Sequence, residues 1–333
     1  MSAFTDAPAQ LRIICDSRID NRAELASALR ISAPALTEMS DAALILRAYQ
    51  RWGMDCPNRL IGDFAFAIWD GRHRRLFCAR DPFGVKPLYY RWDGHRFLWA
   101  SDIQALLGVP GVARRADDAM VMAYLLWEFP DPEATFFDGI KQLQPAHALW
   151  VEQGRLRRFR YWNPAACTTN TRARAEDWLA RFRDEFCEAV HCRLQAPSPI
   201  GLMLSGGIDS VLVAATAADQ CHHRRASAAT LSVFTVLYAD VHQHDRAAIE
   251  RLIQRYHLRA RVISPAIPPP ANSHLADAPG DAFIVHPDAL QAIADEGCRV
   301  VLTGVGADEL LGSSELGILK GLLRRGRLMG LAR

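Results

Sequence analysis

Two hydrophobic patterns follow one another along the chain. Between residues 11 and 162, short apolar and aromatic runs alternate with turn signals, which is typical of antiparallel strands. From residue 176 onward, apolar runs alternate with segments that repeat apolar side chains at helical spacing, which predicts a parallel sheet with crossover helices. The small, polar stretch NPAACTTNTRARA lies between the two patterns. We therefore predict a first domain at 1–162, a linker at 163–175 and a second domain at 176–333.

The elements of the first part are marked by clear boundaries. Asp70-Gly71 and Asp93-Gly94 are hairpin-type turn signals between apolar runs. A helix is predicted over 40–53, with Ser40 as its N-cap and Gly53 just past its end. The predicted strands are FAFAIWD (64–70), RRLFCARD (74–81) and PLYYRWDGHRFLWAS (87–101). This part is therefore expected to be antiparallel sheet with a few helices.

The second part alternates regularly between the two kinds of element. Helices are predicted over 176–194, 207–220, 244–258 and 286–297, and strands over 200–205, 226–238, 259–264 and 298–304. Ligands of parallel sheets bind at the carboxyl ends of the strands. Two glycine-rich segments, GLMLSGGIDS (201–210) and VVLTGVGADE (300–309), follow strands at that edge. They are the candidate ligand-binding turns.

The first of these turns has the residues that a phosphate chain requires. Gly206 and Gly207 carry no Cβ, so a ligand can approach the backbone, and the helix that follows directs its free N–H groups at the same place. Ser205 and Ser210 add hydroxyl donors. Asp209 would repel a phosphate unless a cation lies between them, and Mg²⁺ is the cation that carboxylates and phosphates hold together. The second turn supplies another acidic pair, Asp308-Glu309. The alternative is an N-capped glycine turn without a ligand.

Composition narrows the class of protein further. The chain has 333 residues, half of them hydrophobic and 23% charged, which is typical of two globular domains. No apolar run approaches the roughly 20 residues of a membrane helix, and the N-terminus lacks the features of a secretory signal. A net charge of +2 gives no reason to expect a nucleic-acid partner. Eight cysteines without a C-x-x-C pair indicate reduced thiols in a cytoplasmic protein.

SGGIDS resembles the SGGxDS signature of the PP-loop ATP pyrophosphatases. Four further segments stand in the order that the glutamine-hydrolysing asparagine synthetase family shows: DSRIDNRAEL (16–25), GDFAFAIWD (62–70), RRLFCARDPFGVKPLYY (74–90) and VLTGVGADELLG (301–312). The resemblance implies an N-terminal nucleophile-type glutaminase-like sandwich followed by a PP-loop synthetase domain that is incomplete at its C-terminus. It also implies ATP and Mg²⁺ as cofactors. The residues implied for pyrophosphate are Ser205, Gly206, Gly207, Asp209 and Ser210; for Mg²⁺, Asp209 and Asp308; and for adenine and ribose, Leu204, through its backbone, and Gly304.

The glutaminase half departs from the family pattern. The family begins with a cysteine nucleophile where this chain has Ser2, and the arginine-bearing segment before RIDN is mostly absent. The family's oxyanion-hole Asn-Gly aligns with Asp16-Ser17, and a carboxylate there would repel a developing oxyanion. Asp41 matches the carboxylate that holds the glutamine amine, although a helix can also begin with such an acid. We expect glutaminase activity to be lost.

The synthetase half departs as well. Val305 replaces an acidic residue of asparagine synthetases, which fits relatives that join a carboxylate to an internal amine, such as lasso-peptide cyclases and β-lactam synthetases. The family's later lysine lies beyond residue 333, so we expect a fragment, a split gene product or a decayed copy. The predicted function is an ATP-dependent amide-forming ligase acting on a small acid or a precursor peptide, alone, as a homo-oligomer or with a complementing synthetase fragment. The alternative is a non-catalytic remnant that binds a nucleotide or a partner.

Overall fold

The computed structural model describes residues 2–126, 128, 131–166, 174–195, 199–223, 230–237, 243–264 and 287–307. These residues belong to two units that divide between residues 171 and 172, so the first unit holds the described residues up to 166 and the second those from 174. Each unit has a core of its own. None of the described helices is long and apolar enough to cross a membrane.

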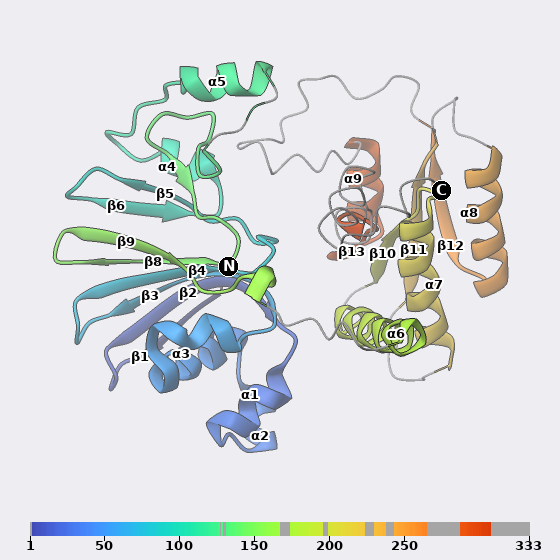
Figure 1. Ribbon diagram of the computed structural model, residues 1–333, viewed down its shortest axis with the longest axis horizontal. Coiled ribbons are helices and arrows are strands. Elements are labelled where there is room, and N and C mark those ends of the chain that lie inside the picture. Colours follow the sequence, from blue (N-terminus) through green and yellow to red (C-terminus); the bar gives the residue numbers. More distant parts are fainter. Residues whose placement is uncertain are drawn as a thin grey trace. The chain divides into compact units, whose positions relative to one another are not determined.

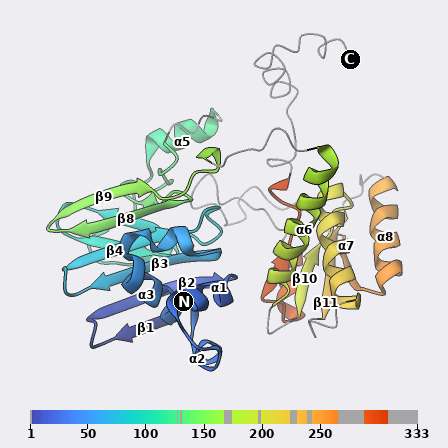
Figure 2. The same cartoon turned by 60° about the horizontal axis from the view of Figure 1, so that its bottom comes forward.

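The first unit is built on a six-stranded antiparallel sheet with the order β1-β2-β3-β4-β8-β9. In Figure 2, β9 lies at one edge of this sheet and β1 at the other. Most neighbouring strands are joined by tight turns, which is how antiparallel pairs form with little chain between them. The strands are β1 (Ser2–Asp6), β2 (Leu11–Ile19), β3 (Gly62–Asp70), β4 (Arg75–Arg80), β8 (His147–Glu152) and β9 (Arg155–Arg160).

A second, three-stranded antiparallel sheet has the order β6-β5-β7, and several helices complete the unit (Figure 1). The strands of this sheet are β5 (Tyr89–Trp92), β6 (Phe97–Ala100) and β7 (Lys141–Gln142). The helices are α1 (Arg22–Leu29), α2 (Ala33–Glu38), α3 (Asp41–Trp52), η1 (Gly53–Arg59), α4 (Ile103–Leu107), α5 (Asp118–Leu125) and η2 (Pro164–Ala166).

Both faces of the large sheet are buried along β3. Phe64, Phe66 and Ile68 face the helical layer, where they pack with residues of α3 such as Leu44 and Ile45. The side chains between them on β3 belong to the core on the opposite face, which also contains residues of the β5 segment and of β8. Because successive side chains of a strand point to opposite faces, burial on both sides explains why β3 is apolar without interruption from residue 64 to residue 68.

The predicted helix over 40–53 is confirmed as α3. The Ser40 hydroxyl caps it by accepting a hydrogen bond from the Ala43 N–H at 3.2 Å. Gly53 ends it with a φ of 58°. The strands predicted over 64–70, 74–81 and 87–101 are confirmed as β3, β4 and the β5–β6 hairpin. The other strands of this unit, β1, β2, β7, β8 and β9, were not predicted individually; β1 pairs Ser2 with Cys15 along the edge of the sheet.

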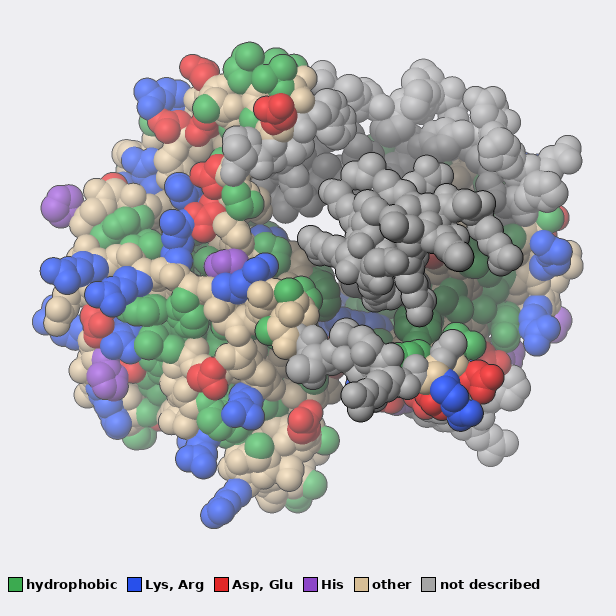
Figure 3. Space-filling view, in the orientation of Figure 1, with side chains coloured by type: hydrophobic (Ala, Val, Ile, Leu, Met, Phe, Trp, Pro, Cys, Tyr) green, Lys and Arg blue, Asp and Glu red, His purple; other side chains and the backbone are tan. Residues whose placement is uncertain are grey.

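Figure 3 shows how side chains are distributed over one face of the first unit. Lys and Arg side chains are interspersed with Asp and Glu. Hydrophobic side chains gather over α5 at the top of this view, and Met122, Leu125 and Leu126 are more than half exposed there. Apart from this helix, the face in view has the mixed charge of an ordinary water-exposed surface.

The second unit is a four-stranded parallel sheet with the order β12-β11-β10-β13. Its strands are β10 (Ile200–Met203), β11 (Leu231–Val236), β12 (Arg259–Ile263) and β13 (Val300–Leu302). Its helices are α6 (Ala175–Arg193), α7 (Ile208–His223), α8 (Gln243–Tyr256) and α9 (Pro287–Asp295). Each predicted element of this part therefore has a counterpart in the structure. The predicted fold class, an antiparallel sandwich followed by a parallel α/β sheet, is confirmed.

Helices cover both faces of the parallel sheet. Residues of α6, α7 and α8 form one core with Leu202 and Val233, whereas Ala292 and Ile293 of α9 pack with Phe234 in a core on the other face. From β10 the chain passes through β11 to β12 on one side of the sheet, and β13 is then added on the other side of β10. The strand order therefore reverses between β10 and β13, and ligands of such sheets bind at this switch point.

Candidate functional site

The carboxyl end of β10 leads through a glycine turn into α7. The Leu204 N–H donates to the carbonyl of Phe234 at 3.0 Å, and its side chain is 2% exposed, so Leu204 continues the sheet into the core. Gly206 has a φ of 87°, a conformation open to glycine and strained for other residues. The backbone turns sharply there, and α7 begins at Ile208. The unpaired N–H groups of the first turn of a helix thereby lie at the edge of the sheet.

Two serine side chains hold this turn together. The Ser210 hydroxyl donates to the carbonyl of Gly207 at 3.0 Å and accepts from the Ser205 N–H at 3.2 Å. The hydroxyl oxygens of Ser205 and Ser210 are 3.0 Å apart. Ser210 is 6% exposed, whereas Ser205 is exposed to solvent. The structure therefore brings the two predicted phosphate-binding hydroxyls together, with Ser205 on the outside.

The second predicted turn packs directly against the first. An ideal Cβ added to Gly304 would lie 2.5 Å from the backbone nitrogen of Ser210 and 2.9 Å from the carbonyl carbon of Asp209. Real Cβ atoms do not approach a backbone this closely, so only glycine fits at position 304. This contact follows from the pairing of β13 with β10, which sets their carboxyl ends side by side. Gly304 and the start of α7 are thus one site, although they are almost a hundred residues apart in sequence.

The acidic residues of the site are described only in part. Asp209 lies half-buried in the first turn of α7, where the partial positive charge of the helix end favours a carboxylate. Asp308, the second predicted Mg²⁺ ligand, lies outside the described residues. Two apolar side chains flank the turns, with Ile208 82% and Val305 66% exposed. The described part of the site therefore combines an open backbone, one carboxylate and an apolar rim.

In the first unit, the predicted glutamine-binding remnant has protein partners. Asp41, the first residue of α3, accepts a hydrogen bond from the Ile19 N–H at 3.0 Å and forms an ion pair with Arg22. Asp16, which aligns with the family's oxyanion hole, forms an ion pair with Lys86 at 3.1 Å. Neither cation was predicted from the sequence, because Arg22 is 19 residues from Asp41 (41 − 22) and Lys86 is 70 residues from Asp16 (86 − 16). The charges of the two acids are balanced within the protein.

A second cluster of the first unit was missed altogether. Asp70, interpreted from sequence as part of a turn, is 4% exposed and accepts hydrogen bonds from the Tyr49 hydroxyl at 3.1 Å and from the His73 ring at 2.7 Å. Burial raises the pKa of Asp70, but the hydrogen bonds from His73 and Tyr49 outweigh burial and hold the pKa below its usual value. An acid at the end of the apolar run FAFAIWD was the available signal; Tyr49 comes from α3, whereas His73 lies three residues further along, in the turn after β3.

Two protein-family models match the chain. The glutamine amidotransferase domain matches residues 3–162 and the asparagine synthase domain matches residues 181–328. These ranges correspond to the antiparallel sandwich and to the parallel sheet. The class of protein defined by the fold and the two matches is an amidotransferase-type domain followed by a synthase domain.

The curated relatives agree with these matches. A Bacillus subtilis (strain 168) protein, asparagine synthetase (glutamine-hydrolyzing) 3, is 34% identical over 237 residues, which are 71% of this chain and 38% of that protein. Asparagine synthetase (glutamine-hydrolyzing) 2 of the same organism is 28% identical over 243 residues, covering 70% and 32%. Amidase chyE of Penicillium rubens is 28% identical over 298 residues, covering 81% and 42%. The chain belongs to the glutamine-hydrolysing asparagine synthetase family. It spans less than half the length of these relatives.

Proposed function

We propose that this chain is an ATP- and Mg²⁺-dependent amide-forming ligase of the asparagine synthetase type. It activates a carboxylate as an acyl-adenylate with release of pyrophosphate, and then transfers the acyl group to an amine with release of AMP. The pyrophosphate site consists of Ser205, Gly206, Gly207, Asp209 and Ser210, with Leu204 and Gly304 on the side of adenine and ribose.

One observation carries this proposal. Gly304 packs on the backbone of Asp209 and Ser210 so closely that a Cβ would collide with it. A turn that only linked β10 to α7 would need no such contact from β13. Two glycine turns that converge at the switch point of a parallel sheet form the crevice in which such folds bind nucleotides.

The described residues of the two glycine turns fit a nucleoside triphosphate. The exposed hydroxyl of Ser205 and the N–H groups at the start of α7 can donate to phosphate oxygens, and the helix end favours negative charge. Asp209 is a hard oxygen ligand of the kind that Mg²⁺ takes together with phosphates. When bound, Mg²⁺ neutralises charge that develops on the leaving pyrophosphate. Preorganised N–H donors and the metal thus act on the same leaving group.

The chemistry of Val305 indicates the kind of amine that receives the acyl group. This side chain is 66% exposed beside the glycine turns and cannot accept a proton or bind a cationic nucleophile. We propose that the amine belongs to a larger apolar substrate, as in a macrolactam-forming ligase of the lasso-peptide cyclase type. The exposed Ile208 on the other turn extends the same apolar rim.

We also propose that the first unit does not hydrolyse glutamine. The Arg22 ion pair and the Ile19 N–H already occupy the carboxylate of Asp41, which would otherwise hold the substrate's amine. Asp16 places a negative charge where the reaction would develop an oxyanion. Glutamate release that exceeds a protein-free blank and is abolished by a glutamine analogue would contradict this proposal.

Calorimetric titration with a non-hydrolysable ATP analogue, with and without Mg²⁺, tests the nucleotide site. Asp209→Ala removes a metal ligand and leaves phosphate charge uncompensated, so affinity should fall about 10- to 150-fold. Asp184→Ala is the matched control, because Asp184 is an exposed acid on α6 of the same unit. It should bind as the wild type does.

The outcomes separate the alternatives. Equal affinity of the wild type and Asp209→Ala for the ATP analogue would show that the glycine turn only links β10 to α7. Binding that is the same with and without Mg²⁺ would show the same. Binding without pyrophosphate release, even with candidate acids and amines present, would favour a nucleotide-binding remnant. Release that appears only after a complementing synthetase fragment is added would show that this chain supplies one part of the site.

A further inference from the structure

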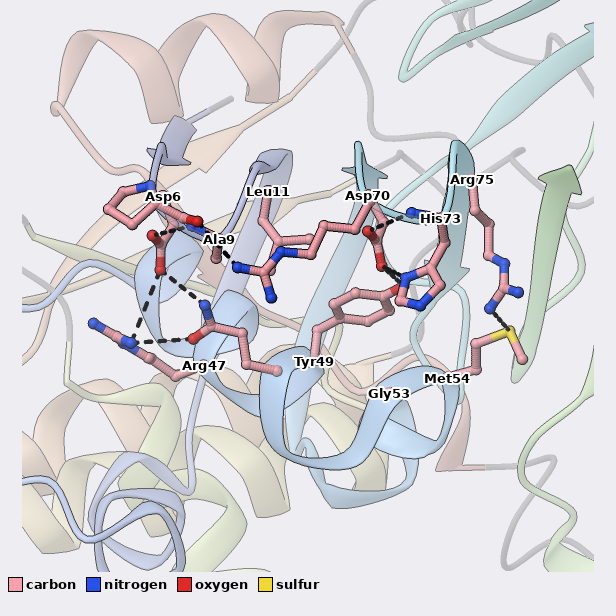
Figure 4. Close-up of a pocket in the computed structure, with 13 residues that line it drawn as sticks. Asp6, Ala9, Leu11, Arg47, Tyr49, Gly53, Met54, Asp70, His73 and Arg75 are labelled. Atoms are coloured by element: carbon pink, nitrogen blue, oxygen red, sulfur yellow. Dashed lines mark hydrogen bonds and ion pairs between the residues drawn. The ribbon is translucent and has the colours of Figure 1, made fainter.

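A cavity in the first unit lies far from the predicted glutaminase residues. It has a volume of about 920 Å³ and lies where β1, β2, β3 and β4 meet the C-terminal half of α3 (Figure 4). Leu11, the first residue of β2, lines it, whereas Ile19, the last residue of that strand, donates to Asp41. At about 3.4 Å per residue the two ends of β2 are roughly 27 Å apart. The cavity is therefore separate from the glutaminase-like end of the sheet.

The acceptors that line this cavity are already used by the protein. Asp6 accepts hydrogen bonds from the Gln50 side chain at 2.8 Å and from the Ala9 N–H at 3.2 Å. Asp70 accepts from the Tyr49 hydroxyl and from the ring and backbone nitrogens of His73. Figure 4 shows Asp70, Tyr49 and His73 turned toward one another. Both carboxylates are therefore parts of the wall and do not call for a cation.

The donors are in surplus. Arg47, Arg72 and Arg75 line the cavity, and each guanidinium has five N–H groups. Arg47 donates to the Gln50 side-chain oxygen at 3.1 Å and lies 3.9 Å from Asp6, and Arg72 donates to the carbonyl of Pro8 at 3.0 Å. Arg75 holds Glu152 through one nitrogen, at 2.9 and 3.1 Å. These contacts use only part of the guanidinium donors, so the remaining N–H groups can donate to an acceptor from outside the chain.

The remainder of the lining is apolar. Pro8 is exposed and Ala9 and Met54 are half-buried, so these three residues present carbon surface to the cavity, whereas Leu11 and Tyr49 are only 5% and 6% exposed. Figure 4 shows Leu11 between the Asp6–Arg47 side and the Asp70–His73 side, so the apolar part lies between two polar ends. An ion alone would leave this surface wet, whereas a ligand with an apolar body would bury it.

We propose that this cavity binds a small organic carboxylate with an apolar body. The carboxylate meets the arginine side chains, whose planar donor pairs match its two oxygens, and the apolar body covers Pro8, Ala9 and Met54. A structural network that only joined α3 to the sheet would need Asp6, Asp70 and their partners, but not the surplus of guanidinium donors.

The test uses the full chain and three probes in calorimetric titration: 3-phenylpropionate, its uncharged amide and inorganic phosphate. The carboxylate should bind in a saturable manner with the dissociation constant below about 1 mM, and the amide and phosphate at least about 10-fold more weakly. Arg72→Gln removes one guanidinium, which donates a hydrogen bond to the carbonyl of Pro8, so the fold should persist. It should weaken binding about 10-fold or more.

Arg157→Gln is the matched control, since Arg157 is an exposed residue of β9 outside the cavity. It should leave the affinity unchanged. Four results would overturn the proposal. The first three are no saturation by the carboxylate up to about 10 mM, equal binding of carboxylate and amide, and equal loss in the two variants. The fourth is phosphate binding as tight as that of the carboxylate, because the apolar lining would then contribute nothing. None of these measurements depends on ATP.

Discussion

Polar side chains gather at strand ends in two regions of this molecule, and they are used differently. At the carboxyl end of β10, Ser205 is exposed, the glycines leave the backbone accessible, and one exposed apolar side chain, Ile208 or Val305, lies on each of the two turns. Toward the Asp41 end of β2, Asp41, predicted to hold a glutamine amine, and Asp16, aligned with the oxyanion hole, each have a cation of the protein beside them. The difference lies in solvent access and charge: the first region, which we propose as a ligand site, keeps an exposed hydroxyl and backbone, whereas the acids of the second region are neutralised within the protein.

The glycine contact should give the largest effect. Gly304→Ala places a Cβ about 2.5 Å from the Ser210 nitrogen, so one of the two turns must move. We expect loss of detectable ATP-analogue binding and a fall in the free energy of unfolding of about 1–3 kcal/mol. Calorimetry and denaturant unfolding measure the two quantities.

Gly108→Ala is the control for this change. Its added Cβ would meet only carbonyl oxygens at 3.5 and 3.6 Å, which is ordinary contact, and its φ is −76°. Unchanged nucleotide binding by Gly304→Ala would show that the two turns do not form one site.

The Arg22–Asp41 ion pair of the first unit should affect the stability of the protein but not its affinity for the nucleotide. Arg22→Met leaves the half-buried Asp41 without its cation and also removes a hydrogen bond to the carbonyl of Leu36 at 3.1 Å. We expect a loss of about 2 kcal/mol in the free energy of unfolding, because an uncompensated charge remains. ATP-analogue affinity should stay at the wild-type value.

A double-mutant cycle with Asp41→Asn sharpens this prediction. The second substitution removes the orphaned charge, so the combined loss should be smaller than the sum of the single losses. Additive losses would mean that Arg22 and Asp41 do not stabilise each other.

The two serines of the glycine turn should differ in a measurable way. Ser210→Ala removes a buried hydroxyl that joins Gly207 to Ser205, so it should lower both stability and ATP-analogue affinity, each by about 1 kcal/mol. Ser205→Ala removes an exposed hydroxyl, so it should lower affinity with little change in stability. Identical profiles of the two variants in calorimetry and unfolding would contradict this division of roles.

The smallest effect is expected on the pH dependence of the free energy of unfolding, through Asp70. The folded-state pKa of Asp70 lies below its ordinary value, so its stabilising contribution is present above about pH 4 and is lost as the pH falls through the folded pKa. Asp70→Asn should therefore make the curve of stability against pH shallower as the pH falls below about 4. Equal slopes for the wild type and Asp70→Asn would show that the contacts of Asp70 do not favour its charged form.

Much of the architecture could be predicted because it depends on local patterns. The alternation of Phe64 and Phe66 with the alanines between them, the Ser40 cap of α3, and the repeated strand–helix spacing after residue 176 are all contained in short windows of sequence. The edge strand β1 was missed because four of its five residues are exposed, so it carries no strong hydrophobic period.

The sequence by itself determined the two-part fold, the position of the glycine turn in front of α7 and the family, because propensity, periodicity and motif spacing are properties of neighbouring residues. Only the tertiary structure decided that Gly304 touches Ser210, that Arg22 neutralises Asp41, and that Asp70 joins Tyr49 and His73 beside a cavity. Except for the Asp70–His73 contact, which spans three residues, these contacts join different elements of the fold that are far apart in sequence. Burial and charge pairing there depend on strand order and on the packing of whole elements, which no local pattern records.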